Sequence, residues 1–332
     1  MLLELDNDQR FWRDTVREAV DKQCPPALVR QIAEGRANAD DLWRWYRDQG
    51  WTELSDPDNL IELILVLEEL GRVTDPTPFL ASLTQFAPLV GDRYDPAGSG
   101  TAVWGGVTTR RARDGWLLDG VARFVLDGDR ADRLAITTAS GVFIVDASQV
   151  VARRLATFDP VLHVADLWFD GVRVAEDDRV VGDRERALQV ALTAMAITTV
   201  GACQRILDLT LDHLKQRKQF GVVIGSFQAL QHKAVDMYVA VERARALAYF
   251  SALTIAAHDP RRRLLARMAK AAAGEAQSQV VRHGMQCFGA MSLTWENDLQ
   301  FAIKRARAGE LLLGSAEEHR TFVAKEYGAA DF

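Results

Sequence analysis

The sequence predicts a multidomain α+β protein. A helical domain is expected over residues 1–100, a middle antiparallel β-sandwich or barrel over 101–180, and a C-terminal four-helix bundle over 181–332. Two observations support this order. Apolar residues recur at helical spacing in the first and last ranges, whereas short β-rich runs alternate with turn dipeptides in the middle range.

In the first range, helices are predicted wherever apolar residues lie three or four positions apart. The predicted helices are Asp8–Lys22, Ala39–Gln49, Asn59–Leu70 and Phe79–Leu89. Gly71 follows the third helix and is a candidate for its C-cap. The run Asp75-Pro76-Thr77-Pro78 breaks the chain before the fourth helix, and the Gly- and Pro-containing loop Gly91–Gly100 is the first candidate domain boundary.

The middle range is predicted to form strands because turn dipeptides recur along it at short intervals. These dipeptides are Asp114-Gly115, Asp119-Gly120, Asp127-Gly128, Ser140-Gly141 and Asp170-Gly171. The predicted strands include Trp116–Leu118, Leu134–Thr138, Val142–Val145 and Ala165–Phe169. Turns this frequent are typical of antiparallel sandwiches and barrels.

Long helical patterns return after residue 181. The predicted helices are Leu188–Gln216, Phe227–His258, Arg261–Gly289, Leu299–Arg307 and Ala316–Tyr327. Ser226 is a candidate N-cap of the second, which Asp259-Pro260 ends. The uncharged run Ala187–Gln204 is long enough to raise the question of a membrane span. Because it is rich in Ala and Thr and poor in Leu, Ile and Val, we expect a helix buried within the bundle instead.

Composition and charge exclude several classes of protein. The 332 residues carry 40 Lys+Arg against 46 Asp+Glu, a net charge of −6, which argues against sequence-independent DNA binding. The three cysteines, Cys24, Cys203 and Cys287, form no CxxC pair, and Cys203 and Cys287 are expected to be buried thiols because they lie in apolar helical stretches. The N-terminal residues lack the pattern of a signal peptide, so a cytoplasmic location is expected.

Motifs for several common chemistries are absent from the sequence. It contains neither a P-loop nor a Rossmann glycine fingerprint, no HExxH metal spacing among its six His and no GxSxG elbow. Zinc chemistry and triad hydrolysis are therefore not expected. His213 and His232 are predicted to be helix-surface residues.

Two C-terminal segments contain residues suited to binding a nucleotide cofactor. Arg217 lies at a predicted helix end beside Gly221, where a guanidinium can pair with phosphate oxygens. Phe220 offers an aromatic face to a flat ring, and Gln228 and Gln286 offer amides that both donate and accept. The residues alone also fit a basic helix cap, an aromatic staple and polar helix faces, so both interpretations remain open at this point.

Both segments resemble motifs of the acyl-CoA dehydrogenase family. The first runs from Arg217-Lys218-Gln219-Phe220-Gly221 through Phe227-Gln228 to Ala234-Val235-Asp236-Met237, and the second begins at Gln286-Cys287-Phe288-Gly289-Ala290. Glu68-Glu69-Leu70-Gly71-Arg72 resembles a third, N-terminal motif. The order of helical and β segments agrees with the family as well.

This resemblance implies α,β-dehydrogenation of an acyl-CoA thioester with FAD, which the family holds across a subunit interface. It implies that FAD is contacted by Arg217, Phe220, Gln228, Leu230, Gln286 and Gly289. Ala290 stands where the family motif has a second glycine.

The sequence departs from the family at the catalytic base. Leu313 and Ala191 occupy the two positions at which branches of the family carry the glutamate that removes the α-proton, and neither side chain can accept a proton. Glu310 is a candidate for a relocated base. The middle domain lacks the family's flavin-covering loop, and Phe124-Val125-Leu126 stands in place of its Trp-Ile-Thr.

These departures predict a non-catalytic subunit that contributes to FAD binding beside a paralogous catalytic acyl-CoA dehydrogenase subunit, in an α2β2 assembly. The partner would bind most of the acyl-CoA. Such pairs resemble actinobacterial enzymes that degrade sterol side chains, which implies a role in lipid metabolism and steroid degradation. Two alternatives remain: a homo-oligomeric dehydrogenase with a relocated base such as Glu310, and a scaffold subunit that has lost FAD. No catalytic residue, metal, nucleic acid or membrane partner is predicted.

Overall fold

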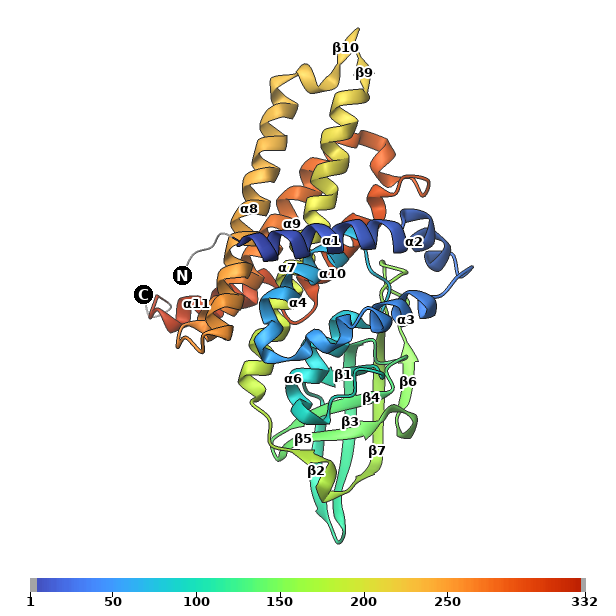
Figure 1. Ribbon diagram of the computed structural model, residues 1–332, viewed down its shortest axis with the longest axis vertical. Coiled ribbons are helices and arrows are strands. Elements are labelled where there is room, and N and C mark those ends of the chain that lie inside the picture. The colour runs from blue at the N-terminus through green and yellow to red at the C-terminus, as the bar shows by residue number, and fades with distance from the viewer. Residues whose placement is uncertain (1–4, 330–332) are drawn as a thin grey trace. The chain divides into compact units, whose positions relative to one another are not determined.

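The computed structural model describes residues 5–329 and confirms the predicted order of helices, sheets and helices (Figure 1). The chain divides into two compact units. The bundle unit comprises the described parts of Met1–Gln31, Leu60–Asp75 and Leu192–Phe332, and the sheet unit comprises Ile32–Asn59 and Pro76–Ala191. These units interleave along the chain, and the division into 1–100, 101–180 and 181–332 stays a prediction.

The sheet unit contains two four-stranded sheets. In sheet order, the first consists of β1 (Gly100–Val103), β4 (Arg133–Thr138), β5 (Gly141–Asp146) and β8 (Arg179–Val180). The second consists of β2 (Val107–Ala112), β3 (Gly115–Leu126), β7 (Val164–Val174) and β6 (Val151–Arg154). Neighbouring strands are antiparallel, as predicted, except β1 and β4, which pair in parallel.

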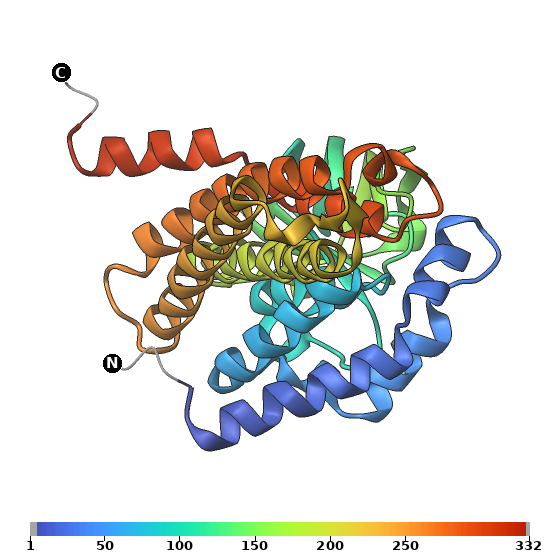
Figure 2. The same cartoon turned by 90° about the horizontal axis from the view of Figure 1, so that it is seen from above.

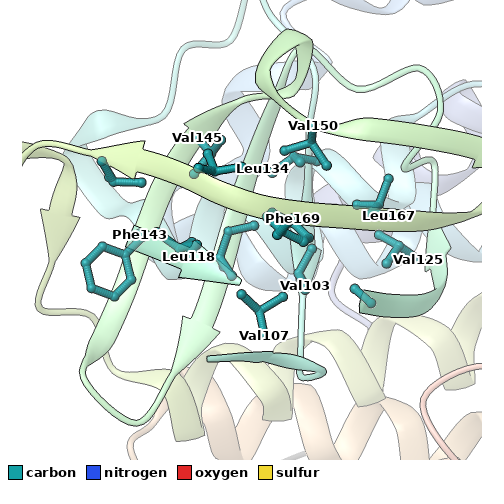
Figure 3. Packing of buried hydrophobic residues seen from close by; sticks show 14 of the residues in the cluster. Val103, Val107, Leu118, Val125, Leu134, Phe143, Val145, Val150, Leu167 and Phe169 are labelled. Carbon is teal, nitrogen blue, oxygen red and sulfur yellow. The ribbon is translucent and has the colours of Figure 1, made fainter. Parts of the chain in front are cut away.

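A hydrophobic core forms between side chains of both sheets (Figure 3). Val103, Leu134 and Phe143 belong to the first sheet, and Leu118 and Phe169 belong to the second. Successive side chains of a strand point to opposite faces, so each strand supplies this core with alternate residues. The four predicted strands are confirmed, and each is longer than predicted.

Short helices cover the other face of the first sheet. Phe86, Leu89 and Val90 pack there against Ala135 and Ile144. The helices of this unit are α3 (Asp40–Asp48), α5 (Phe79–Ala81) and α6 (Ala87–Val90), with a π-helical segment over Ser82–Phe86.

The bundle unit is built from long helices. They are α1 (Asn7–Gln23), α4 (Leu60–Val73), α8 (Gln228–Ala256), α9 (Arg262–Phe288), α10 (Leu299–Leu311) and α11 (Ala316–Glu326). Two further helices, α2 (Pro26–Ala33) and α7 (Arg184–Gln216), each cross from one unit into the other. Within the bundle unit α8 and α9 run side by side, and α10 and α11 both pack on α9 (Figures 1 and 2). The predicted helices are present, with bounds that differ by a few residues.

Close helix contact explains the small residues of α7. A Cβ atom at Gly201 would lie 1.9 Å from the carbonyl oxygen of Glu68, and one at Gly71 would lie 2.1 Å from that of Thr198. Gly71 is thus an interior residue of α4 and not its C-cap, because the helix continues to Val73 and its backbone touches that of α7. Glycine permits this approach because it has no side chain.

By length and hydropathy α7 is the one helix among the described residues that could cross a membrane, with a mean hydropathy of 1.5 over its most apolar window. In the structure 89% of that window is buried within the protein. Burial of this extent agrees with the expectation of a core helix.

Ser226 does not cap α8 as predicted. Its hydroxyl donates to the carbonyl of Val223 at 2.7 Å, and the N-cap position belongs to Phe227, which makes no side-chain capping bond. Ser226 instead closes the short turn that leads into the helix.

Candidate functional site

The first of the segments that resemble family motifs begins at Arg217 and forms an exposed hairpin between α7 and α8. Its strands, β9 (Lys218–Gln219) and β10 (Val222–Val223), are joined by Phe220 and Gly221, which have φ angles of 53° and 80°. A two-residue turn with positive φ at both positions suits a hairpin, but a non-glycine residue adopts that conformation at a cost. This turn conformation leaves the ring of Phe220 90% exposed and edge-on to the ring of Phe227, with 6.2 Å between the ring centroids.

Arg217 lies at the base of this hairpin, just after α7. Its backbone N–H donates to the carbonyl of His213 at 2.9 Å, and its own carbonyl accepts from Ile224 N–H at 2.8 Å. Its exposed guanidinium has no hydrogen bond or ion pair with any described residue. The backbone at Arg217 is therefore held in place while its charge stays available to an anion.

His213 differs from its prediction as a surface residue. It is half-buried, and its ring stacks on Phe288 with 4.2 Å between the centroids. Burial, assisted by the nearby charge of Arg217, lowers the pKa of His213. This stacking joins the C-terminal ends of α7 and α9.

The second resembling segment lies at the end of α9. Gln286 is exposed in the last turn, and Gly289 follows the helix with φ of 61°. Between them Cys287 is buried with Leu214 and Ile224 in a small hydrophobic cluster, against which Leu230 packs. The structure thus brings the two segments together, and Leu230 contributes to the packing between them. Gln228 is exposed at the start of α8.

A groove of about 640 Å³ adjoins the second segment. It is lined by Gln277, Ser278, Val281, Arg282, Met285, Gln286, Gly289, Ser292, Leu293 and Arg307. Gln286 and Gly289 thus line one concave surface, whereas Arg217, Phe220, Gln228 and Leu230 lie outside that lining. Arg282 and Arg307 match no motif; the only sequence signal for Arg282 is its position one helical turn before Gln286.

A loop that follows the groove is anchored by α2. Arg30 donates to the carbonyls of Trp295 and Glu296 at 2.7 and 3.1 Å, and to the carboxylate of Asp298 at 2.5 Å. One guanidinium thus binds three acceptors along four consecutive residues. The loop of the second segment is held by the N-terminal part of the bundle unit.

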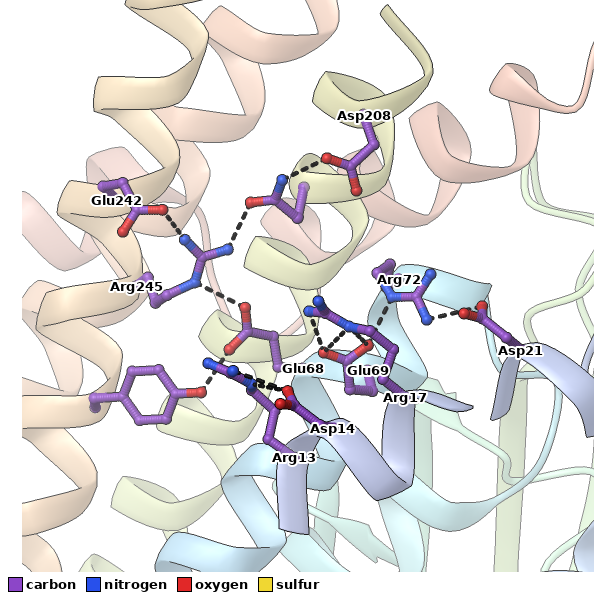
Figure 4. Close-up of polar contacts among 12 residues, drawn as sticks. Arg13, Asp14, Arg17, Asp21, Glu68, Glu69, Arg72, Asp208, Glu242 and Arg245 are labelled. Carbon is purple, nitrogen blue, oxygen red and sulfur yellow. Dashed lines mark hydrogen bonds and ion pairs between the residues drawn. The ribbon is translucent and has the colours of Figure 1, made fainter. Parts of the chain in front are cut away.

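The third resembling segment forms a polar network within the bundle unit (Figure 4). Glu68 of α4 accepts hydrogen bonds from Arg245 at 2.7 Å and from the hydroxyl of Tyr249 at 2.6 Å. Arg245 also pairs with Glu242 and donates to Gln204. Burial would lower the pKa of Arg245, but the carboxylates of Glu68 and Glu242 raise it overall.

Glu69 extends this network on the other side of α4. Its fully buried carboxylate forms ion pairs with Arg17 of α1 at 2.7 Å and with Arg72 at 2.6 Å, and Arg72 also pairs with Asp21. A buried charge requires such partners, since leaving it unpaired would be costly. This motif therefore joins α1, α4 and α8, and its role in this chain is structural.

Leu313 lies in the turn between α10 and α11, with φ of 59°. The fully buried Lys270 donates to the carbonyls of Glu310 and Gly314 at 3.0 and 2.7 Å, and His319 Nε2 donates to the carbonyl of Leu313 at 3.0 Å. Burial lowers the pKa of Lys270 to about 8 and that of His319 to about 4. These hydrogen bonds stabilise the turn that carries the apolar side chain of Leu313.

Glu310 is engaged in the same turn. Its buried carboxylate accepts from the backbone N–H of Ala316 at 3.2 Å and pairs with Arg307 at 3.1 Å. Ala191, the other predicted base position, is 1% exposed within α7. A general base must reach its proton within hydrogen-bonding distance, and the contacts of Glu310 are those of a residue that stabilises the start of α11.

The middle-domain residues that differ from the family form a bulge in β3. Phe124 has φ of 55° and is 68% exposed, and its N–H donates to Asp166 at 3.2 Å. Arg123 pairs with the same carboxylate. Leu126 is buried, so no hydroxyl occupies the position at which the family has threonine.

The described residues include no group of three or more metal-ligating side chains. Cys203 and Cys287 are buried free thiols, as expected, and so is Cys24; burial raises the pKa of each. The chemistry available at this end of the bundle unit is therefore that of free guanidinium groups, amides and an exposed aromatic ring.

Comparison with known proteins places this chain in a family. Residues 184–328 match the acyl-CoA dehydrogenase C-terminal domain. Acyl-CoA dehydrogenase IpdE2 of Mycolicibacterium smegmatis is 32% identical over 95% of this chain and 97% of its own length, and IpdE2 of Mycobacterium tuberculosis is 32% identical over 94% of each. The chain belongs to the acyl-CoA dehydrogenase family.

Solved structures agree with this fold. The ChsE4-ChsE5 complex of Mycobacterium tuberculosis superposes with a TM-score of 0.89 at 24% identity, over 99% of both chains. Glutaryl-coenzyme A dehydrogenase gives 0.86 at 22% identity, over 99% of this chain and 97% of that one. The helix–sheet–helix architecture is thus that of acyl-CoA dehydrogenases.

The family implies FAD, and residues of this chain fit the phosphate-bearing part of that cofactor. The guanidinium of Arg217 pairs with no described residue, Gln286 has an exposed amide and Phe220 an exposed ring. The described residues that line the groove include two arginines and no carboxylate. Guanidinium groups bind phosphate oxygens through paired N–H donors, so this donor set matches the diphosphate.

Proposed function

We propose that this chain is the non-catalytic subunit of a cytoplasmic, FAD-dependent acyl-CoA dehydrogenase, and that it helps to bind FAD at the interface with a paralogous catalytic subunit. The observation that carries the proposal is the turn at Leu313. There an apolar side chain stands at the family's base position, and the neighbouring carboxylate of Glu310 is bound by Arg307 and by Ala316 N–H. Removal of an α-proton needs a free, positioned base.

Exposed apolar side chains support a partner subunit. Phe220 and Phe227 of the hairpin region are 90% and 39% exposed, and Val235, Tyr238 and Val239 of α8 are each more than half exposed. The α8 residues lie three and four positions apart, so they share one face of the helix. Clustered apolar surface of this kind marks protein interfaces.

Related proteins support the identity of the partner and the substrate class. The solved ChsE4-ChsE5 structure is of a complex of two proteins, and a further similar structure is described as the Tcur3481-Tcur3483 steroid acyl-CoA dehydrogenase. By analogy we propose a heterotetramer, α2β2, in which the partner carries the base and most of the acyl-CoA site, and a steroid-derived acyl-CoA substrate. Bound FAD would supply the acceptor for the β-hydride in this assembly.

The proposal is tested by producing the chain alone and together with the acyl-CoA dehydrogenase subunit that is encoded nearest to it in the genome. We expect flavin absorbance and acyl-CoA oxidation only from the complex. A lone chain that purifies yellow and oxidises acyl-CoA would refute the division of labour and favour a homo-oligomer with a relocated base. A purified complex without flavin would favour a scaffold role.

Arg217→Ala tests the site within the complex. Loss of a charge-assisted contact to phosphate typically costs about 1.5–3 kcal/mol, so FAD should be retained at least tenfold less tightly. Arg113→Ala is the matched control, because Arg113 is exposed in the turn between β2 and β3 and makes no hydrogen bond or ion pair with another described residue. Equal flavin-to-protein ratios in the two variants would count against Arg217 as a cofactor contact.

A further inference from the structure

A tryptophan stands on the short connection between β1 and β2. Strand β1 ends at Val103 and β2 begins at Val107, so Trp104, Gly105 and Gly106 form the whole connection. This is the point at which the sequence lacks the family's flavin-covering loop. An indole is a large apolar group, so the packing of Trp104 decides whether this region of the sheet unit is open or filled.

The indole of Trp104 is fixed by a hydrogen bond and by packing. Its N–H donates to Oε1 of Gln85 at 3.0 Å, and Gln85 is buried. The ring packs against the hydrophobic cluster of the sheet unit that includes Phe86, Ala102 and Ala187. The N–H of a tryptophan in such a position usually has a partner, so the bond to Gln85 fixes the direction in which the ring points.

Gln85 belongs to a turn of unusual geometry. The segment Ser82–Phe86 is π-helical, and hydrogen bonds join it to both ends of β1. Gly100, the first residue of β1, donates its N–H to Oγ of Ser82 at 3.1 Å. Trp104, which directly follows β1, donates to Gln85. π-Helical turns are rare and often lie at functional sites. This turn holds β1 and the indole in one fixed arrangement.

The cluster around Trp104 covers the start of α7. Ala187 is fully buried within the cluster, and Ala191 lies one helical turn later on the same face of α7 and is buried as well. Ala191 is one of the two predicted base positions, and a base acts only on a proton within its reach. We call the space that an acyl group would need beside Ala191 the acyl site of this chain. Because Ala191 is buried, other side chains already fill this space.

We infer that Trp104, held in place by Gln85, closes the acyl site of this chain and thereby confines the acyl-CoA to the partner subunit. The inference rests on the proposed function, because a subunit without a catalytic base does not need an acyl site of its own. Removal of a large packed side chain leaves a cavity when its surroundings cannot collapse. The indole is larger than a butyl group, and the π-helical turn is bonded to β1, so the cavity left by Trp104→Ala would accept a short acyl chain.

Equilibrium dialysis of the purified complex against S-butyl-coenzyme A tests this inference. This thioether carries the coenzyme and a short chain but no carbonyl, so its α-protons are not acidic and it is not oxidised. In Trp104→Ala the number of molecules bound per pair of subunits should rise by one. Trp104→Leu, which keeps an apolar side chain for packing, should add the same site with weaker affinity.

Trp168→Ala is the matched control. Trp168 is a partly buried tryptophan of β7 in the same unit, its ring contacts the guanidinium groups of Arg123 and Arg153, and it lies outside the cluster around Trp104. The number of S-butyl-coenzyme A molecules bound by this variant should equal that of the wild type.

The outcomes separate this inference from the proposed function. An added site in the Trp104 variants, and not in Trp168→Ala, supports Trp104 as the residue that closes the acyl site; if Trp104→Ala does not assemble, Trp104→Leu decides the question. Unchanged binding in assembled Trp104 variants with wild-type helical circular dichroism, or an added site in Trp168→Ala as well, would overturn the inference and leave the proposed function standing. Oxidation of acyl-CoA by the lone wild-type chain would refute the proposed function, and that measurement needs no substitution.

Discussion

Replacement of Gly201 by alanine should strongly destabilise the bundle unit, because α4 and α7 are in backbone contact at this position. A Cβ atom at Gly201 would lie 1.9 Å from the carbonyl oxygen of Glu68 and 2.9 Å from the backbone nitrogen of Arg72. Ordinary contacts of a Cβ begin near 3.4 Å, so α4 would have to move by about 1.5 Å, the difference between 3.4 and 1.9 Å. No side-chain rotation can relieve this clash, since the obstacle is the backbone.

The expected cost follows from two opposing effects. Overpacking of a core typically costs about 1–3 kcal/mol, and an obstacle that cannot rotate away places Gly201→Ala at or above the upper end of that range. The greater helix propensity of alanine returns about 1 kcal/mol. Displacement of α4 also strains the bonds of Glu68 to Arg245 and Tyr249. We therefore expect a net loss of at least about 2 kcal/mol.

Urea unfolding, followed by the circular dichroism of the helices, measures this loss. Gly105→Ala is the matched control, because no atom lies within 4 Å of a Cβ there and its φ is not in the left-handed region. The control should change the free energy of unfolding by less than about 0.5 kcal/mol. Equal unfolding midpoints for Gly201→Ala and the wild type would refute the close packing of α4 on α7.

Two further predictions concern the turn between α10 and α11. His319 has a pKa of about 4 against an ordinary 6.5, because its ring is buried and the charges of Lys270 and Arg267 oppose its protonation. The hydrogen bond from Nε2 to the Leu313 carbonyl raises this pKa, but by less than burial and Lys270 lower it. As the pH falls, the unfolded chain therefore takes up this proton before the folded chain does. The contribution of His319 to the free energy of unfolding should be complete above pH 6.5 and fall by up to about 3 kcal/mol between pH 6.5 and 4. Unfolding measured across this range should show a weaker pH dependence for His319→Gln than for the wild type, and an unchanged pH dependence would contradict the burial of the neutral ring. Glu310→Gln should lower thermal stability but leave the rate of acyl-CoA oxidation by the complex within about twofold of the wild type. If Glu310 were a relocated base, the same substitution would lower kcat by at least about a hundredfold.

The sequence alone predicted those features that depend on neighbours along the chain. Apolar residues three or four positions apart predicted the long helices, and alternating β-rich runs with turn dipeptides predicted the strands, because these patterns reflect the local geometry of each element. Two segments with family resemblance predicted a common cofactor site, and the cluster around Cys287 brings them together. The absence of a carboxylate at position 313 was also evident from the residues.

Other features depended on contacts between distant segments. Gly71 appeared to end a helix, but it lies inside α4 because α7 approaches there. Glu68 and Glu69 looked like part of a family motif, and only the structure showed their partners on α1 and α8. A linear pattern carries no information on which charged residues will meet across helices.

By itself, therefore, the sequence determined the order of elements, the family and the residues that stand at the predicted base positions. The tertiary structure decided how those residues are used. It engages the carboxylate of Glu310 with Arg307 and the start of α11, whereas Arg282 pairs with no described residue and lines a groove whose described lining contains no carboxylate. The physical reason is that burial and pairing, which set whether a charge is free to bind a ligand, arise from helices that pack together after long intervals of chain.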